Sequence, residues 1–301
     1  MGCRSTRIGA VSLRGNRSPL PCTGWNGAAR YRLQKGMESS PKLAGVVLAG
    51  SSSRETDLLA PYTQGQPKGL LPIAGRPMLA YVVEALAGSR YICSVIVVGL
   101  PPEVWPSLPL PVTYLPPYGD LIRNAEAGVR HALQTLPDLF GVVVSSADIP
   151  LLTPRIVDRF VEECLRTDHD IYYSVVERSV MEGRFPTSRR SYVRLAEGEF
   201  AGGDIFLVRA GARMADPELW QKVTNARKSA LRQAQLLGGP WAVLKLLLGH
   251  MSLAEAERRA SQALRIRGRA VVSPDPEVGM DVDKPFQLEI VRSVLESSGY
   301  G

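Results

Sequence analysis

The chain reads Pro67-Lys68-Gly69-Leu70-Leu71-Pro72-Ile73-Ala74-Gly75-Arg76-Pro77-Met78-Leu79 one loop after the apolar segment Ala44-Gly45-Val46-Val47-Leu48-Ala49-Gly50. This order places a turn of small residues, and then a lysine, where a buried strand ends. Parallel α/β sheets bind phosphates at that edge. Together the two segments predict an α/β protein that handles nucleotides.

The positive charge of the chain is concentrated in its first 36 residues. They hold seven of the 36 Lys and Arg residues and none of the 29 Asp and Glu residues. The rest of the chain carries 29 residues of each sign, so the net charge of +7 belongs to this leader. Because the body is neutral, we expect no nucleic acid partner.

The leader is rich in Gly, Ser and Arg and lacks hydrophobic periodicity, which predicts disorder. Three interpretations stay open. An Arg-rich, acid-free segment is typical of a transit peptide, a basic arm would bind nucleic acid, and an upstream extension would precede a natural start at Met37. We therefore separate residues 1–36, a disordered basic leader, from a folded domain at 37–301.

The cysteines and the apolar runs exclude other classes. The four cysteines contain no CxxC pair, which predicts neither a disulfide framework nor a zinc site. The longest apolar run, at 241–248, is interrupted by Lys245 and is far shorter than the ~20 residues that span a bilayer. We expect a buried or groove-lining helix there, no membrane contact, and a cytoplasmic location.

From residue 43 onward, β-branched runs alternate with helical periodicity, which is typical of βαβ units in a mostly parallel sheet. The expected strands are 43–48, 95–98, 112–115, 141–146, 171–176, 192–195, 202–208 and 270–272. The expected helices are 78–88, 119–136, 155–165 and a closing helix that ends near 295. A long basic connection is expected at 178–190, and a helical region at 217–264 is broken at 238–240 and at Gly249.

Two aspartates follow segments that would run as strands to the same edge of the sheet. They are Asp148 and Asp283, and each precedes a proline, two residues on, that stops the strand. Mg²⁺ is typically held by one or two carboxylates plus phosphate oxygens, so this pair predicts a metal site. Two alternatives stay open. The first is that one or both aspartates are N-caps of the following helix. The second is that Asp281 is the metal ligand in place of Asp283, because residues two apart on a strand share a face.

Three further positions suit a nucleotide. The loop Gly50-Ser51-Ser52-Ser53-Arg54 would wrap a triphosphate, with Arg54 and Lys68 as its cations. Gly119 and Asn124 stand where a later loop would meet the nucleobase, and the amide of Asn124 offers both a donor and an acceptor. An ordinary helix-start role for Asn124 is equally open.

At these residues the chain resembles the nucleotidyltransferases of the molybdenum-cofactor guanylyltransferase type, within the superfamily that includes the sugar-1-phosphate nucleotidylyltransferases. The matching pieces, which cover nearly all of residues 43–295, are LAG at 48–50, PKGLLPIAGRPML at 67–79, SADIPLLTP at 146–154, GGDIFLV at 202–208 and DVDKPFQLE at 281–289.

The resemblance implies a GT-A-like (Rossmann-like) three-layer α/β/α sandwich with a mostly parallel sheet, and makes 37–301 a nucleotidyltransferase domain. It implies a triphosphate held by Leu48, Ala49, Gly50, Ser51, Arg54 and Lys68, Mg²⁺ held by Asp148 and Asp283, and Lys68 and Asp148 as catalytic residues. An NTP would then transfer its NMP to a phosphorylated small-molecule acceptor, with release of pyrophosphate. Gly202, Gly203 and Arg184 would contact that acceptor. Further candidates are Arg189, Arg190, Arg227 and Lys228, and a merely solvated basic surface is the alternative for all of these charged residues.

The chain departs from the family in its first loop. The usual double glycine is Gly50-Ser51 here, and the family's arginine normally falls one residue later than Arg54. Lys68 follows Gly50 by 18 positions, which is closer to the sugar-nucleotide enzymes. The acceptor therefore cannot be named by analogy.

Two other functions stay open. A GT-A glycosyltransferase shares the fold and uses an Asp-x-Asp metal motif, which Asp281-Val282-Asp283 superficially offers. A non-catalytic nucleotide sensor would keep the fold without turnover, and the altered first loop is its support.

Overall fold

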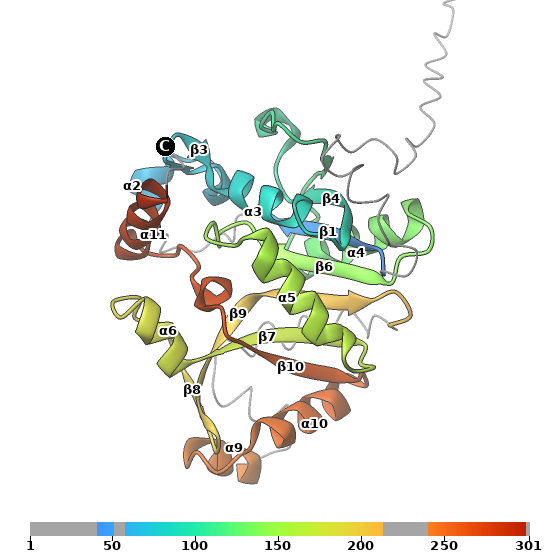
Figure 1. The fold of residues 1–301 in the computed structure, drawn as a ribbon, viewed down its shortest axis with the longest axis vertical. Coiled ribbons are helices and arrows are strands. Elements are labelled where there is room, and N and C mark those ends of the chain that lie inside the picture. Colours follow the sequence, from blue (N-terminus) through green and yellow to red (C-terminus); the bar gives the residue numbers. More distant parts are fainter. Residues whose placement is uncertain (1–40, 51–57, 213–239, 299–301) are drawn as a thin grey trace, which may run out of the picture. The chain divides into compact units, whose positions relative to one another are not determined.

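The centre of the fold is a mixed sheet of eight strands (Figure 1). This computed structural model describes residues 41–50, 58–212 and 240–298, which belong to one compact unit beginning at Ser39. The strand order is β10-β7-β9-β6-β1-β4-β5, and β8 pairs with β9. The bounds are β1 Leu43–Leu48, β4 Ile92–Val98, β5 Thr113–Leu115, β6 Gly141–Ser146, β7 Ile171–Glu177, β8 Val193–Leu195, β9 Gly198–Arg209 and β10 Gly268–Ser273.

The sheet is mostly parallel, as predicted. β1 runs parallel to β4 and β6, β4 to β5, and β7 to β10, whereas β9 is antiparallel to its neighbours β6, β7 and β8. All six residues of β1 are buried, which explains its continuous apolar run. Leu48 pairs with Val98 on one side and with Ser146 on the other. The carboxyl ends of β1, β4 and β6 therefore meet at one edge.

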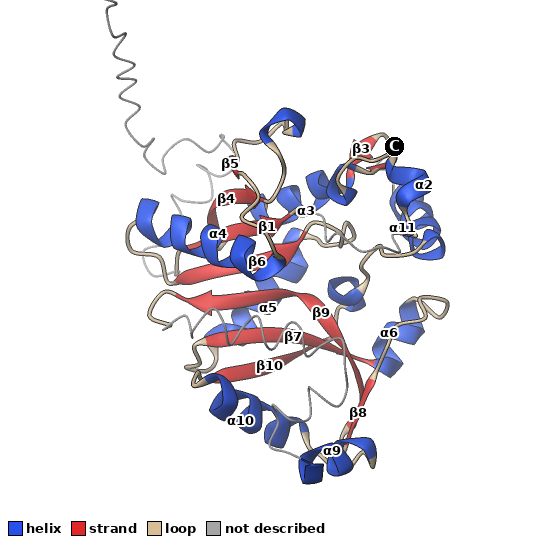
Figure 2. Cartoon of the chain, turned by 180° about the vertical axis from the view of Figure 1, so that it is seen from behind, coloured by secondary structure: helices blue, strands red, loops and turns tan. Residues whose placement is uncertain are grey.

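Helices cover both faces of the sheet. α3 (Met78–Ala87) and α5 (Pro154–Leu165) lie on the face seen in Figure 1, and α4 (Leu121–Thr135) and α10 (Leu253–Leu264) lie on the face seen in Figure 2. The remaining helices are α2 (Ala60–Thr63), α6 (Arg178–Arg184), α9 (Pro240–Leu247) and α11 (Pro285–Ser297). This arrangement is the Rossmann-like α/β class that the resemblance implies, built on the mostly parallel sheet that the alternating pattern predicts.

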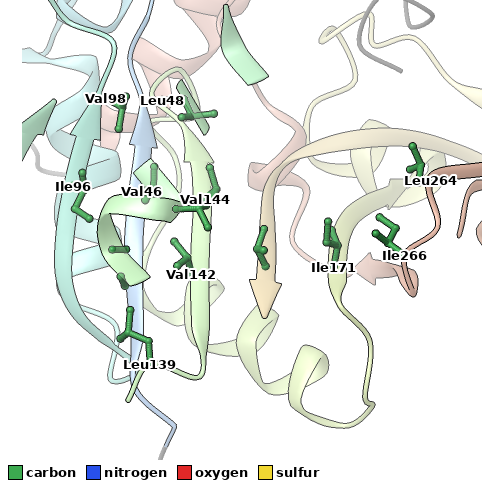
Figure 3. Packing of buried hydrophobic residues seen from close by; sticks show 14 residues of the cluster. Val46, Leu48, Ile96, Val98, Leu139, Val142, Val144, Ile171, Leu264 and Ile266 are labelled. Atoms are coloured by element: carbon green, nitrogen blue, oxygen red, sulfur yellow. The ribbon is translucent and has the colours of Figure 1, made fainter. Parts of the chain in front are cut away.

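One buried cluster joins the second of these faces to its helices (Figure 3). Its sheet residues include Val46, Leu48, Ile96, Val98, Val142 and Val144, and its helical contributions include Val129, Ala132 and Leu264. Alternate residues of β1 and β4 supply it because side chains along a strand alternate between faces. The β-branched runs of the sequence are thus the core that fixes the edge where β1, β4 and β6 end.

Most expected elements are confirmed within a few residues, and three features differ from the expectation or add to it. The basic connection at 178–190 contains α6, β9 begins four residues before the expected strand, and a hairpin of β2 (Pro72–Ile73) and β3 (Arg76–Pro77) turns at Ala74 and Gly75. The helical region does break at Gly249, which has φ +68°. Its part at 213–239 lies outside the described residues, as does the leader, and the division at residue 37 stays a prediction.

The expectation for 241–248 is a buried or groove-lining helix, and burial is wrong for three of the side chains that the structure describes there. Leu247 of α9 is 69% exposed, and Leu244 and Leu248 are half-exposed. Leu246, in contrast, packs on the cluster that contains Leu195 and Met251. A short helix that touches the sheet through one face leaves its other leucines in solvent. Among the described residues, no helix has the length and apolar character needed to cross a membrane.

Gly128 fixes the approach of α4 to the sheet. A Cβ there would lie 2.7 Å from Val46 Cγ1 and 3.0 Å from Val98 Cγ2. We expect Gly128→Ala to lower the free energy of unfolding by about 1 kcal/mol, because overpacking by ~1–3 kcal/mol exceeds the gain in helix propensity.

The matched control is Gly183→Ala in α6, where a Cβ would meet open space. We expect it to raise the free energy of unfolding by up to ~1 kcal/mol. Urea denaturation of both variants measures the two signs. An equal gain at both positions would contradict the packing of α4 described above.

Candidate active site

Lys68 opens a 3₁₀ turn that packs against the ends of β1 and β6. The turn runs Lys68–Leu70, and the Leu71 N–H donates to the Lys68 carbonyl at 3.0 Å. A Cβ on Gly69 would lie 3.3 Å from Ala147 Cβ and 3.6 Å from Ala49 Cβ. Because this contact is so close, the turn sits directly over the edge where β1 and β6 end, which places the lysine there.

The ammonium group of Lys68 joins the two predicted metal carboxylates. Its Nζ donates to Asp148 Oδ2 and to Asp283 Oδ1, each at 2.5 Å. The Lys68 and Asp148 side chains are 24% and 18% exposed, and Asp283 is 44% exposed. Burial acts to lower the pKa of Lys68, but the attraction of the two carboxylates outweighs it and raises that pKa above its ordinary value. The cluster therefore carries one fixed cation between two anions.

Asp148 follows β6 directly, as predicted. Ser146 Oγ donates to its Oδ1, and its backbone carbonyl accepts from the Val282 N–H at 2.9 Å. The N-cap of α5 is Thr153, whose side chain accepts from the Ile156 N–H. The cap interpretation of Asp148 is therefore wrong.

Asp283 reaches the cluster by a different route from the one expected. β10 ends at Ser273, and a 3₁₀ turn at Pro276–Gly279 intervenes, so Asp283 does not directly follow a strand. The N-cap of α11 is Lys284, so Asp283 is not its cap either. Buried Met280 and Val282 anchor the segment, and both are 0% exposed.

Asp281 and Asp283, the two candidates for the second metal ligand, have different partners in the structure. Asp281 forms an ion pair with Arg190, and both side chains are largely buried. Asp283 instead shares Lys68 with Asp148. The two aspartates of Asp281-Val282-Asp283 therefore serve different partners and do not act as one Asp-x-Asp pair.

The first loop is described only to Gly50. Leu48 and Ala49 are buried, and the Ala49 N–H donates to the Val98 carbonyl at 2.8 Å. A Cβ on Gly50 would lie 2.6 Å from Asn124 Nδ2, so glycine is required where the end of β1 meets α4. Ser51 and Arg54 lie outside the described residues, and so do Arg227 and Lys228.

Asn124 ties the loop before α4 to this edge. Its side chain is 3% exposed, and its Oδ1 accepts from the Tyr118 N–H at 2.7 Å. Gly119, next along the loop, has φ +111°, a conformation that favours glycine. Asn124 thus supports the loop through its oxygen, and its contact with a nucleobase, like that of Gly119, stays a prediction.

The contacts that the structure describes for the predicted acceptor residues Gly202, Gly203 and Arg184 are with partners other than Lys68. A Cβ on Gly202 would lie 2.4 Å from Tyr173 Oη, and one on Gly203 would lie 2.2 Å from Ser174 Oγ. The missing side chains therefore make room for β7 against β9. Arg184 is 55% exposed, with its Nε 3.9 Å from Glu277 Oε1. An acceptor contact at these residues stays a prediction.

Ser146, Arg190 and Gln287 contact Asp148 or the segment that carries Asp283. Sequence reasoning proposed only an acceptor contact for Arg190 and no role for the other two. Ser146 stands two residues before Asp148 at a strand end, which was a usable signal. Gln287 stands three residues after the Lys284 cap, the spacing of a capping box. The pairing of Arg190 with Asp281 joins residues 91 positions apart, and nothing local indicates it.

A parallel sheet edge that holds a lysine between two carboxylates, beside a glycine loop, defines a nucleotide-handling α/β enzyme of the transferase class. The chain belongs to the family of the MobA-like NTP transferase domain, whose profile matches residues 45–269. Residues 45–269 therefore form a domain of the nucleotidyltransferase class.

Two curated proteins with the same name are similar to part of this chain. The bifunctional protein GlmU of Rhodospirillum rubrum is 30% identical over 133 residues, which are 42% of this chain and 27% of that protein. GlmU of Paramagnetospirillum magneticum is also 30% identical, over 42% of this chain and 26% of that protein. The matched part thus spans about a quarter of these curated relatives.

Among solved structures, a hypothetical transferase from Thermus thermophilus is 37% identical with a TM-score of 0.69, covering 82% of this chain and 99% of that one. A CMP:2-keto-3-deoxy-manno-octonic acid synthetase complexed with CTP is 16% identical with a TM-score of 0.50, covering 85% of this chain and 99% of that one. The second likeness concerns the fold alone.

Proposed function

We propose that this protein is a Mg²⁺-dependent nucleotidyltransferase that transfers an NMP group from an NTP to a phosphorylated small-molecule acceptor and releases pyrophosphate. The observation that carries the proposal is the convergence of Asp148 and Asp283 on the ammonium group of Lys68, at the edge where β1 and β6 end. Open α/β sheets bind their ligands at this edge.

The residues at this edge fit a magnesium ion. Asp148 and Asp283 present hard oxygen donors within hydrogen-bonding distance of one atom, and Mg²⁺ takes one or two such carboxylates together with phosphate oxygens. Asp148 and Asp283 would hold the ion. When bound, it would neutralise the charge that develops on the phosphate oxygens.

The chain's own residues supply position and charge. Lys68 places a cation beside the polyphosphate, and the Gly50 turn lets the backbone approach it. An acceptor oxygen forms a bond to the α-phosphorus while the bond to the bridging oxygen breaks, and pyrophosphate leaves with the electron pair. A phosphate monoester is mostly deprotonated at neutral pH, since its second pKa is about 6. Such an acceptor attacks without a general base.

Two alternatives find less support. A GT-A glycosyltransferase would use Asp281 and Asp283 together, whereas Asp281 pairs with Arg190. A nucleotide sensor has no need for two carboxylates gathered on one cation. The Thermus thermophilus relative agrees with the proposal, because it is named a transferase and the match covers 99% of its chain.

Pyrophosphate release tests the proposal. The full chain is incubated with each of the four NTPs, Mg²⁺ and a panel of phosphorylated acceptors, and the product is identified by mass. We expect one pairing to release pyrophosphate, to depend on the acceptor, and to stop when the metal is chelated. Nucleotide binding without release for every acceptor would favour the sensor.

A further inference from the structure

We propose that Gln287 and the Asp281–Arg190 ion pair are positioning residues, which hold the Asp283 carboxylate beside Asp148 and fasten it to the connection between α6 and β8. The inference rests on the proposed function, because Asp283 is the residue proposed there to hold the metal. It adds a group of residues outside the Lys68 cluster that determine where Asp283 stands.

Gln287 is a buried amide with both ends engaged. It lies in the first turn of α11 and is 2% exposed. Its Oε1 accepts from the Asp283 N–H at 3.0 Å, and its Nε2 donates to the Ser188 carbonyl at 3.5 Å. Ser188 is itself only 1% exposed. Since unpaired buried polar groups cost free energy, this amide fixes the backbone of Asp283 relative to the connection.

The ion pair fastens the same segment two residues earlier. Arg190 and Asp281 are 15% and 14% exposed. Removing one partner of a largely buried pair leaves an uncompensated charge, which is strongly unfavourable. The ion pair therefore restrains the backbone around Arg190 and around Asp281.

Three consecutive residues of the connection contact the segment that carries Asp283. Ser188 contacts Gln287, the guanidinium of Arg189 lies 5.3 Å from the centre of the Phe286 ring, and Arg190 pairs with Asp281. Arg189 has φ +49°, which is uncommon for a residue other than glycine. Three successive contacts with one segment specify its position more strongly than any one of them.

Between these contacts, Val282 joins the segment to the other carboxylate. Its N–H donates to the Asp148 carbonyl at 2.9 Å, and its side chain is fully buried. Asp281, Val282 and Asp283 therefore contact, in turn, the connection, the Asp148 backbone and Lys68. A shift of the connection would change the distance between the two metal carboxylates.

Binding of Mn²⁺ together with an NTP tests this role without an acceptor. The wild-type chain is titrated calorimetrically with Mn²⁺ in the presence of each NTP, and the best NTP is kept. We expect Gln287→Leu to weaken Mn²⁺ binding roughly tenfold, which is the usual cost of losing a residue that orients a metal ligand. Gln287→Glu keeps an oxygen for the Asp283 N–H but loses the donor to the Ser188 carbonyl, so its Mn²⁺ affinity should fall between those of the wild type and Gln287→Leu.

A double-mutant cycle shows whether Gln287 acts through Asp283. In an Asp283→Ala background, Gln287→Leu should weaken Mn²⁺ binding no further, because coupled residues are not additive. Additive losses, or unchanged binding in Gln287→Leu alone, would overturn the positioning role. A wild-type chain that binds no Mn²⁺ with any NTP would refute the proposed function itself.

Arg190→Met tests the second fastening in the same assay. Its control is Arg267→Met, which breaks pairs with Asp168 and Asp170 at the opposite end of β7 and β10. We expect only Arg190→Met to weaken Mn²⁺ binding, and we expect the charge exchange Arg190→Asp with Asp281→Arg to restore part of it. Equal losses for Arg190→Met and Arg267→Met would indicate general destabilisation and overturn the assignment.

Discussion

Replacing Asp148 with alanine should lower the rate of pyrophosphate release by at least ~10²-fold, the usual cost of losing one principal electrostatic stabiliser of the transition state. Asp148 contacts Lys68, accepts from Ser146, and shares the cluster with Asp283. A ~10²-fold loss corresponds to about 2.7 kcal/mol of transition-state stabilisation. The measurement is steady-state pyrophosphate release with the NTP and acceptor found for the wild type.

Two further variants make the Asp148 result specific. Asp148→Asn keeps the shape and removes the charge, so it should lose nearly as much rate as Asp148→Ala. Asp170→Ala removes an aspartate of similar exposure, 21% against 18%, from an ion pair with Arg267 at the far edge of the sheet. It should lower stability but leave the rate within a few-fold. An Asp148→Ala rate within a few-fold of wild type would refute the assignment.

The edge of the sheet that carries the candidate site was predictable, because the residues that form it are close together in the sequence. The β1 run is buried on both faces, so it is continuously apolar, and the PKG stretch that follows packs through Gly69 onto the ends of β1 and β6. Asp148 comes directly after β6, so strand prediction alone placed it. In such cases a stretch of about a dozen residues contains both the strand and the functional residue that follows it.

The route of Asp283 was not predictable in this way. Its segment is held by Asp148, Gln287 and the residues near Arg190, which are partners far away in the sequence. A period-two rule made Asp281 and Asp283 equivalent, but the segment is not a strand, and the two side chains serve different partners. The different environments of Asp281 and Asp283 therefore come from tertiary contacts, which the local sequence pattern does not contain.

The basic connection at 178–190 shows the same limit. Its charge suggested a solvated loop or an acceptor site, while the structure forms α6 and draws Arg190 into a largely buried pair. Arg184, seven residues after the end of β7, remains exposed. Composition described the surface charge of this connection correctly but did not predict the largely buried ion pair of Arg190 with Asp281.

Lys68→Met should produce the second large effect, a loss of at least ~10²-fold in pyrophosphate release, because a fixed cation beside the polyphosphate is removed. It should also change how metal affects stability. In the wild type the ammonium group already neutralises Asp148 and Asp283. Without it, two carboxylates repel each other in the metal-free protein, which lowers its melting temperature.

In the proposed site, Mg²⁺ would approach the same carboxylate oxygens that the ammonium group of Lys68 contacts, so removal of the lysine would remove a competitor. Added Mg²⁺ should therefore raise the melting temperature of Lys68→Met by more than it raises that of the wild type, since a ligand stabilises according to its affinity for the folded state. Lys42→Met, at an exposed lysine just before β1, is the matched control and should respond like the wild type. Thermal melts with chelator and with Mg²⁺ measure the difference. An equal Mg²⁺ response in Lys68→Met and wild type would show that the two carboxylates do not share their oxygens between the lysine and the metal.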